Sequence, residues 1–181
     1  RSRGLGDVYK RQTDNVLLAY DEGDATMVGA AMTVVDAECA SATRLDDSLV
    51  ETWFGHRNNV DALESLISKG YVVDTMEVSA PWSRLDAIYE AATSAIAAVP
   101  GTLAVSAHQS HSYVTGACLY FTFAGQVDPP EREAYYCAAW DAGTRAVLDG
   151  GGSLSHHHGI GLNRARFVAD ALGPALDVLA S

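Results

Sequence analysis

The ten residues GACLYFTFAG (116–125) alternate between two kinds of side chain, and this alternation constrains the fold more than any other stretch. Successive side chains of a strand point to opposite faces, so the run predicts one aromatic and aliphatic face and one mixed face. A single apolar face is typical of an antiparallel sheet that is covered on one side. The apolar face carries Leu119, Phe121 and Phe123, and the other face carries Cys118, Tyr120 and Thr122.

Further strand-like runs and several helical periodicities surround this stretch. Asp24, Ser83 and Asp128 each precede a helical pattern, where a short polar side chain can cap the first turn. Glu131 stands at the capping-box position after Asp128, and Pro174 interrupts the last helical pattern. We expect strands at 15–20, 70–79 and 102–108, and helices at 25–39, 45–53, 61–68, 83–99, 129–148 and around 167–172.

This order of elements predicts the fold class. Strands joined by hairpins and helices, without a repeating strand-helix-strand pattern, favour an α+β fold: an antiparallel sheet with helices on one face, of ferredoxin-like type. The 181 residues suffice for one domain or for two small subdomains.

Composition excludes several classes of protein. With 48% hydrophobic and 19% charged residues, the chain is a folded globular protein. A net charge of −11 argues against nucleic acid as a partner, and the sequence has neither GxGxxG after a strand nor GxxxxGK[ST]. Three widely spaced cysteines (Cys39, Cys118, Cys137) favour a reducing compartment, so we expect a cytoplasmic protein.

The first twelve residues, RSRGLGDVYKRQ, differ from the rest of the chain. They hold four of its twelve basic residues and have no apolar periodicity. We expect residues 1–12 to be a non-native leader left by cloning or sequence assembly, and residues 13–181 to form the native domain. The alternative is a short native basic arm.

The segment GGSLSHHHGIGLNRARF (151–167) concentrates half of the six histidines in a glycine-rich stretch. In an extended backbone His156 and His158 would point to one side and His157 to the other. Imidazoles that titrate near neutral pH, with Arg164 and Arg166 nearby, could bind phosphate or exchange protons with a substrate. A solvated surface loop is the other interpretation.

A metal site is a competing hypothesis for the same histidines. His108 and His111 form an H-x-x-H pair, which together with the triplet supplies enough nitrogen ligands for zinc. The spacing matches no zinc-finger pattern, and no cysteine or acidic residue is close by in sequence. A stand-alone α+β module that binds zinc or phosphate therefore stays open as a function.

Tyr120 and Arg57 are two further candidates. Tyr120 lies opposite the apolar face of its strand, and its phenol could act as an acid or base if a neighbouring cation lowers its pKa. The alternative is an interfacial tyrosine with a hydrogen-bonded tip. Arg57 lies in a predicted loop, where it could anchor a substrate anion or simply be solvated.

Three stretches in this order, DTMEVSAPWSRL (74–85), GACLYFTFAG and GGSLSHHHGIG, resemble the C-terminal cap half of alkyldihydroxyacetonephosphate synthases. These enzymes belong to the FAD-linked oxidases of the vanillyl-alcohol-oxidase type. The resemblance covers roughly residues 15–172 and implies that Tyr120 transfers protons and that His156, His157 and His158 are catalytic. It also implies FAD as cofactor, held mainly by an N-terminal domain that is missing here, and exchange of an acyl chain for a fatty alcohol without net oxidation.

One departure from that family concerns the substrate phosphate. The family binds it with an arginine shortly before the SAPW corner, where this sequence has none, and Arg57 is the nearest candidate. An FAD-linked 2-hydroxy-acid oxidase or dehydrogenase is the alternative, since such enzymes also carry an HGIG loop, although their HxGDGNxH stretch is lacking here. The expected partner is a lipid or small-molecule substrate; peripheral membrane contact and a homodimer stay open.

Overall fold

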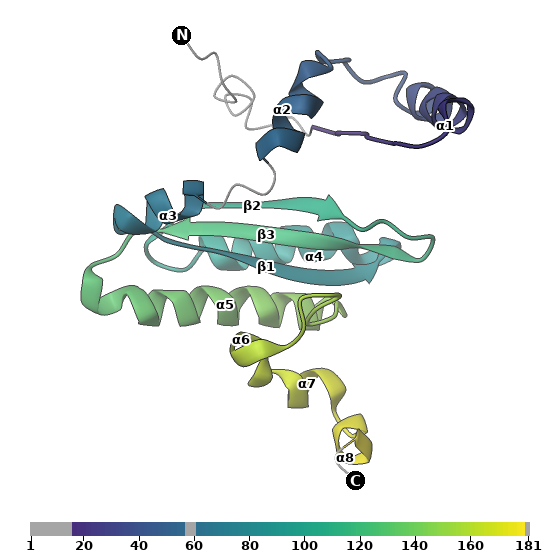
Figure 1. Cartoon of the computed structure of the whole chain (residues 1–181). Helices are drawn as coiled ribbons and strands as arrows, with labels where there is room; N and C mark the ends of the chain where they lie inside the picture. Colours follow the sequence, from purple (N-terminus) through teal and green to yellow (C-terminus); the bar gives the residue numbers. More distant parts are fainter. Residues whose placement is uncertain (1–15, 57–60, 180–181) are drawn as a thin grey trace. The chain divides into compact units, whose positions relative to one another are not determined.

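A computed structural model describes residues 16–56 and 61–179 of the chain, which divide between residues 59 and 60 into two units. The first unit contains helices α1 (Ala25–Glu38) and α2 (Ser48–His56). The second contains a three-stranded sheet and the remaining helices (Figure 1).

The first unit confirms the predicted cap of its first helix and corrects one predicted strand. The Asp24 carboxylate accepts hydrogen bonds from the backbone N–H groups of Thr26 and Met27, at 2.9 and 3.3 Å. Residues 16–20 form no strand, because no strand in the described part of this unit is present to complete a ladder. The Tyr20 ring packs instead against Phe54, with ring centroids 5.2 Å apart.

The sheet of the second unit is antiparallel, as predicted. Its strands are β1 (Val72–Pro81), β2 (Thr102–Ser110) and β3 (Gly116–Gly125), in the order β1-β3-β2. The alternating run identified in the sequence is therefore the central strand. The fold is α+β, in agreement with the sequence-based expectation.

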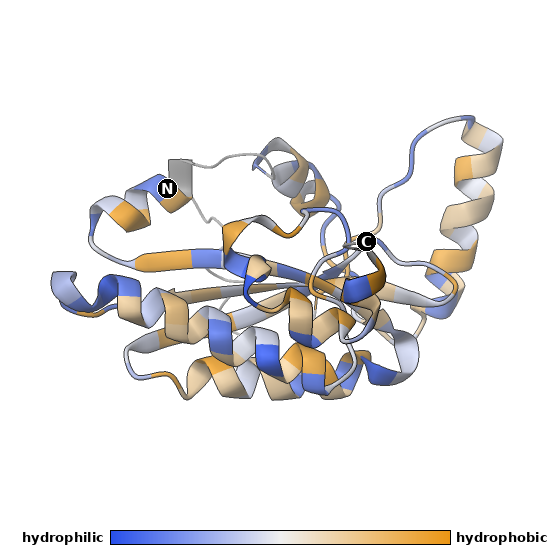
Figure 2. Ribbon diagram, turned by 90° about the horizontal axis from the view of Figure 1, so that it is seen from below, coloured by the Kyte–Doolittle hydropathy of each residue, from blue (hydrophilic) through white to orange (hydrophobic). Residues whose placement is uncertain are grey.

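Two long helices, α4 (Trp82–Ala97) and α5 (Arg132–Asp149), cover one face of the sheet (Figures 1 and 2). Phe121 and Phe123 are fully buried beneath them, which confirms the predicted apolar face. A shorter helix, α3 (Asp61–Ser68), precedes β1 and contacts it. The centre of the core consists of Met76, Val78, Leu85, Ile88, Ala92, Ile96, Ala139, Trp140 and Val147.

Two predicted helix caps are wrong. α4 begins directly after Pro81, so Ser83 lies inside the helix, and the Trp82 indole N–H donates to the Tyr113 carbonyl at 2.8 Å. Proline suits this corner because its fixed φ leads into a helix and it has no N–H to satisfy. Asp128 precedes a 3-10 turn, Pro129–Glu131, and makes no side-chain cap bond there, so the capping box is not formed.

The C-terminal part consists of three short helices. They are α6 (Gly161–Ala165), α7 (Val168–Leu172) and α8 (Ala175–Leu179), with Pro174 between the last two, as predicted. Phe167 is buried and joins this part to the rest of the unit. Over residues 16–56 and 61–179, no helix combines the length and the apolar character needed to cross a membrane.

Candidate active site

Three side chains form a row across the face of the sheet that α4 and α5 leave open. Glu77 on β1 lies directly opposite Tyr120 on β3, and His108 on β2 lies opposite Tyr120 on its other side. The alternation that buries Phe121 turns Tyr120 toward this open face, as predicted. The His108 ring stacks on the Tyr120 ring, with centroids 4.7 Å apart and an interplanar angle of 11°.

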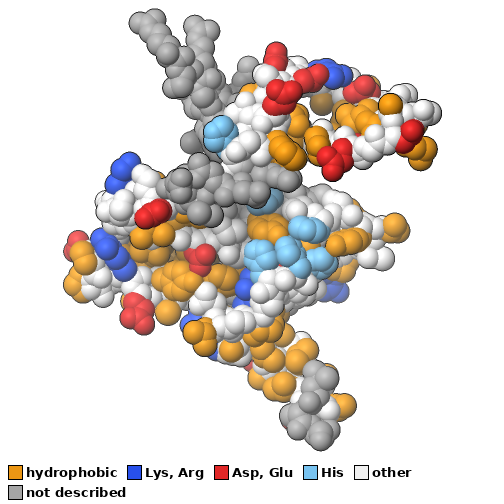
Figure 3. Space-filling model, viewed as in Figure 1, with side chains coloured by type: hydrophobic (Ala, Val, Ile, Leu, Met, Phe, Trp, Pro, Cys, Tyr) orange, Lys and Arg blue, Asp and Glu red, His pale blue; other side chains and the backbone are white. Residues whose placement is uncertain are grey.

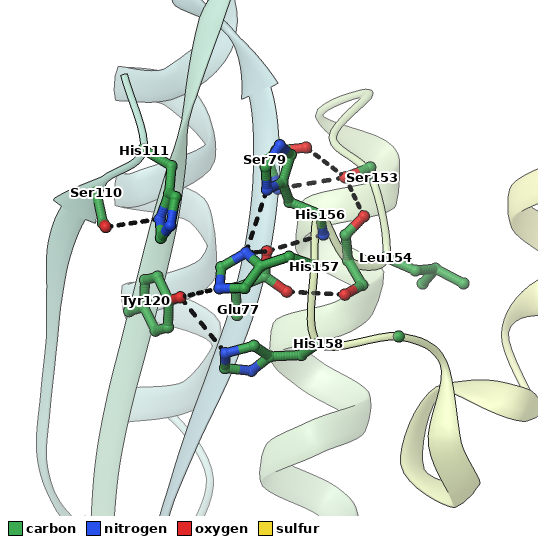
Figure 4. A network of polar contacts seen from close by, with 12 residues as sticks. Glu77, Ser79, Ser110, His111, Tyr120, Ser153, Leu154, His156, His157 and His158 are labelled. Atoms are coloured by element: carbon green, nitrogen blue, oxygen red, sulfur yellow. Dashed lines mark hydrogen bonds and ion pairs between the residues drawn. The ribbon is translucent and has the colours of Figure 1, made fainter. Parts of the chain in front are cut away.

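The glycine-rich segment after α5 carries the histidine triplet past β1 to the same face. Gly151 has a positive φ of 75°, which turns the chain at the end of α5. Ser153 then bridges to β1: its N–H donates to the Ser79 carbonyl at 2.8 Å, and the two hydroxyls are 2.7 Å apart. This attachment brings His157 and His158 to the Tyr120 hydroxyl, with His156 beside His157 (Figure 4).

The Glu77 carboxylate binds the histidine loop, residues 153–158, through hydrogen bonds. It is fully buried, and it accepts hydrogen bonds from the Ser155 hydroxyl at 2.7 Å and from the His156 backbone N–H at 2.8 Å. Burial alone would raise the pKa of Glu77, but these hydrogen bonds and the nearby His157 lower it below its ordinary value. Glu77 is therefore a carboxylate at neutral pH. Glu77 is not among the site residues predicted from the sequence.

Tyr120 is hydrogen-bonded to the triplet. Its hydroxyl lies 2.6 Å from Nε2 of His157 and 3.4 Å from Nε2 of His158 (Figure 4). The expectation that His157 points away from its two neighbours is therefore wrong. It assumed an extended backbone, whereas this loop bends where Glu77 binds the His156 N–H.

The pKa shifts indicate which group carries the proton. Burial, followed by the negative charge of Glu77 and the proximity of Cys118, raises the pKa of Tyr120. The sequence-based condition, a cation that lowers this pKa, is not met. Desolvation lowers the pKa of His157, the charge of Glu77 opposes this, and three neighbouring histidines add to the lowering. At neutral pH Tyr120 is therefore a phenol and His157 a neutral imidazole, and the tautomer of His157 decides which of them donates the hydrogen bond between Oη and Nε2.

The H-x-x-H pair joins the same cluster, as the metal hypothesis required. The His111 ring lies 4.4 Å from that of His157 and 5.9 Å from that of His156, measured between centroids. Figure 3 shows a patch of histidine side chains on the second unit with hydrophobic side chains beside it. Four side chains of the described residues offer ligand atoms within 4.8 Å of one another: Glu77, Cys118, His156 and His157.

Hydrogen bonds within the protein already engage these donors. Glu77 accepts one hydrogen bond on each carboxylate oxygen. Burial, followed by the charge of Glu77 and a hydrogen bond to it, raises the pKa of the Cys118 thiol. Nε2 of His157 contacts the Tyr120 hydroxyl, whereas its Nδ1 faces Glu77 and His156.

The two arginines after the triplet do not form the predicted anion site. Arg164 is buried and donates to the carbonyl groups of Leu154 (2.8 Å), Glu77 (3.1 Å) and Gly159 (3.2 Å). The exposed Arg166 donates to the Cys137 carbonyl and lies over the Phe167 ring. The guanidinium of Arg164 is thus used inside the protein to hold the loop. Arg57 lies outside the described residues, so its role stays a prediction.

A groove of about 530 Å³ begins beside His156. Its walls include Pro81, Tyr113, Ala117 and Gly152, which are apolar, aromatic or small. It therefore offers space for an apolar part of a ligand next to the histidines.

Comparison with known proteins places the chain in a family. Residues 8–180 match the family described as "FAD linked oxidases, C-terminal domain". The chain belongs to this family.

Curated relatives with this domain are much longer than the chain. The uncharacterized FAD-linked oxidoreductase YgcU of Escherichia coli (strain K12) is 30% identical over 168 residues, which cover 84% of this chain and 35% of YgcU. The alkyldihydroxyacetonephosphate synthase of Dictyostelium discoideum is 30% identical over 118 residues, 61% of this chain and 19% of that enzyme. The chain thus spans about a third or less of each relative.

Solved structures of alkyldihydroxyacetonephosphate synthase have the same fold in this region. One aligns with 68% of the chain and 23% of its own length, with a TM-score of 0.51 and 26% identity. A second aligns with 71% of the chain at a TM-score of 0.54 and 20% identity, which supports the fold alone.

Membership of the FAD-linked oxidase family implies FAD as cofactor. The described residues fit one part of the FAD molecule. The open face of the sheet presents the Tyr120 hydroxyl and several exposed imidazole rings, which suit an aromatic ring system and its substrate. The buried guanidinium of Arg164 already has three carbonyl partners, so it cannot hold a pyrophosphate. The open face of this FAD-linked oxidase domain therefore fits the ring end of the cofactor.

Proposed function

We propose that the chain is the substrate-binding cap of an FAD-dependent enzyme similar to alkyldihydroxyacetonephosphate synthase, which exchanges the acyl chain of acyl-dihydroxyacetone phosphate for a fatty alcohol. The observation that carries the proposal is the 2.6 Å hydrogen bond between Tyr120 and His157, in a chain 30% identical to such a synthase over 118 residues. Tyr120, His156, His157 and His158 would be the catalytic residues.

FAD, held mainly by an N-terminal domain, would supply the ring beside which the substrate reacts. Tyr120 and the histidines would lie against that ring and the substrate. The groove beside His156 would take the alkyl chain of the lipid, because its walls are largely apolar. Arg57 would hold the substrate phosphate, since a guanidinium binds phosphate through two parallel hydrogen bonds.

The residues of this chain would move one proton. A substrate O–H or C–H bond breaks, its proton goes to Oη of Tyr120, and the proton that Tyr120 carried moves to Nε2 of His157. The bonding electron pair stays on the substrate, and His157 becomes a cation next to the Glu77 carboxylate, whose oxygen lies 3.4 Å from its Nδ1. The reverse transfer returns the proton to the product.

FAD-linked oxidation of a 2-hydroxy acid is a second candidate. One comparison favours an oxidoreductase, without indicating its substrate: the match to the uncharacterized FAD-linked oxidoreductase YgcU covers 84% of the chain, more than the 61% covered by the synthase of Dictyostelium. The same Tyr120–His157 pair would then take the hydroxyl proton of the substrate.

A comparison of wild type, Tyr120→Phe and Tyr89→Phe in the full-length protein encoded by the source gene tests the proposal. Each is incubated with acyl-dihydroxyacetone phosphate and a radiolabelled long-chain alcohol, and alkyl product is counted. We expect Tyr120→Phe to retain flavin and to lose about 100-fold or more of the exchange rate, because a positioned acid or base contributes that much. Tyr89 is an exposed residue of α4, and its variant should exchange at the wild-type rate.

Three outcomes would contradict the synthase proposal. If wild type exchanges no alcohol but its flavin is bleached anaerobically by a 2-hydroxy acid, the second candidate is correct. Equal exchange by Tyr120→Phe and wild type would remove Tyr120 from the mechanism. Purified protein with stoichiometric zinc and no flavin would show a stand-alone metal-binding module.

A further inference from the structure

The buried Glu77 has a geometric relation to His157 that the proposed chemistry does not yet use. Oε1 of Glu77 lies 3.4 Å from Nδ1 of His157, on the side of the imidazole ring opposite to Nε2. Nε2 lies 2.6 Å from the Tyr120 hydroxyl. Carboxylate, imidazole and phenol thus form a chain from the interior of the protein to the open face (Figure 4).

The arrangement favours one tautomer of His157. Nδ1 of His157 faces Oε1 of Glu77 at 3.4 Å and Nδ1 of His156 at 3.1 Å. A proton on Nδ1 can be donated to Nδ1 of His156 and is attracted by the Glu77 carboxylate, and it leaves Nε2 free to accept from Tyr120. With the proton on Nε2 instead, the Nδ1 lone pair would face a buried carboxylate, which is unfavourable.

Glu77 is itself held in place with little freedom. It lies on β1 directly opposite Tyr120, and its side chain is 0% exposed. The Ser155 hydroxyl and the His156 N–H fix the two carboxylate oxygens separately. A preorganised charge of this kind stabilises a cation that forms during a reaction without reorganising at that moment.

We propose that Glu77 is a positioning residue, which holds His157 as the Nδ1–H tautomer and stabilises its cation when Nε2 takes the proton of Tyr120. The catalytic role of this cation rests on the proposed function, but the tautomer does not. This role of Glu77 adds no proton transfer to the proposed mechanism. The Nδ1–H bond of His157 remains intact, and only the Oη–H bond of Tyr120 is exchanged for an Nε2–H bond.

Heteronuclear NMR of the 181-residue chain with ¹⁵N-labelled histidine tests the proposal without FAD or substrate. In wild type we expect the His157 ring nitrogens to show a protonated Nδ1 and an unprotonated Nε2. Glu77→Met removes the acceptor and should move His157 toward the Nε2–H tautomer. Glu77→Gln keeps an acceptor but removes the charge, so His157 should bind a proton at least about tenfold more weakly.

Ser155→Ala is the matched control for a purely structural role. It removes one bond that ties the loop to Glu77 and leaves the carboxylate facing His157. We expect it to keep the wild-type tautomer and to change the proton affinity of His157 by less than about twofold. The titration must be assigned against the groups that face His157 from each element: Glu77, Cys118, Tyr120, His111, His156 and His158.

Several results would overturn the proposal. They are an Nε2–H tautomer of His157 in wild type, an unchanged proton affinity of His157 in Glu77→Gln, and a loss of this affinity in Ser155→Ala as large as that in Glu77→Gln. The first can be read even if a Glu77 variant fails to fold. Zinc bound at Nδ1 of His157 would also overturn it.

In the full-length enzyme, Glu77→Gln should shift the acid limb of the kcat profile with pH, whereas Ser155→Ala should not. If the NMR results hold but no variant or wild type catalyses exchange or oxidation, the proposed function fails while the role of Glu77 in setting the tautomer stands.

Discussion

Arg164→Met is the substitution whose cost follows most directly from the structure. The guanidinium joins three segments, because it donates to Glu77 on β1, to Leu154 before the triplet and to Gly159 after it. It also lies over the Trp140 ring of α5, 5.1 Å from the centroid. Methionine retains the unbranched apolar stem of the side chain but is shorter and offers no donor.

The expected loss can be estimated from the carbonyl groups left without a partner. Leu154 and Glu77 are buried, so water cannot easily replace the lost donor at either carbonyl, whereas Gly159 is exposed and can be hydrated. A buried acceptor left unsatisfied costs about 1–3 kcal/mol, so Arg164→Met should lose about 3 kcal/mol of the free energy of unfolding. The substitution also removes the cost of burying the guanidinium charge, which offsets part of the lost free energy of unfolding and keeps the expected loss near this value.

The control is Arg166→Met, two residues further along. Arg166 is exposed and donates to a single carbonyl, that of Cys137, so we expect a loss within about 0.5 kcal/mol. Urea denaturation, followed by circular dichroism and tryptophan fluorescence, measures both variants. A loss below about 1 kcal/mol for Arg164→Met, or one equal to that of Arg166→Met, would refute the view that this guanidinium holds the histidine loop.

Two further predictions concern stability. Gly125→Ala should cost about 1–3 kcal/mol in urea denaturation, because the added Cβ would overlap the buried ring of Tyr135; Gly29→Ala has open space and should cost nothing. Since folding lowers the pKa of Glu77, the folded state binds fewer protons, and wild type should lose stability as pH falls from about 5 through that lowered pKa. Glu77→Gln should lose less over the same interval, although it is less stable at pH 7; parallel losses in the two proteins would contradict this.

Local patterns predicted the parts of the site that depend on one strand. The alternation around Phe121 and Phe123 placed Tyr120 on the open face, because side-chain direction in a strand is set by the backbone alone. The same rule could have found Glu77. It stands between the buried Met76 and Val78, and a charged residue there must point to the side where Tyr120 points.

The parts that the sequence could not predict depend on contacts between distant segments. The bend of the triplet results from a bond between His156 and Glu77, which are 79 residues apart, so no rule for an extended loop could foresee it. Arg164 was considered for a phosphate site because it stands shortly after the histidine triplet in the sequence. Its burial depends on three carbonyl groups that converge only in the folded chain.

The row Glu77, Tyr120 and His108 has a consequence for how such enzymes diversify. The phenol belongs to the central strand, and its two neighbours belong to separate outer strands, each directly opposite it. A substitution at position 108 changes the ring next to the phenol, whereas one at position 77 also releases the histidine loop that Glu77 binds. In the proposed mechanism, exchange of His108 would therefore change the surroundings of the reacting oxygen atom while the pairing of the three strands is kept.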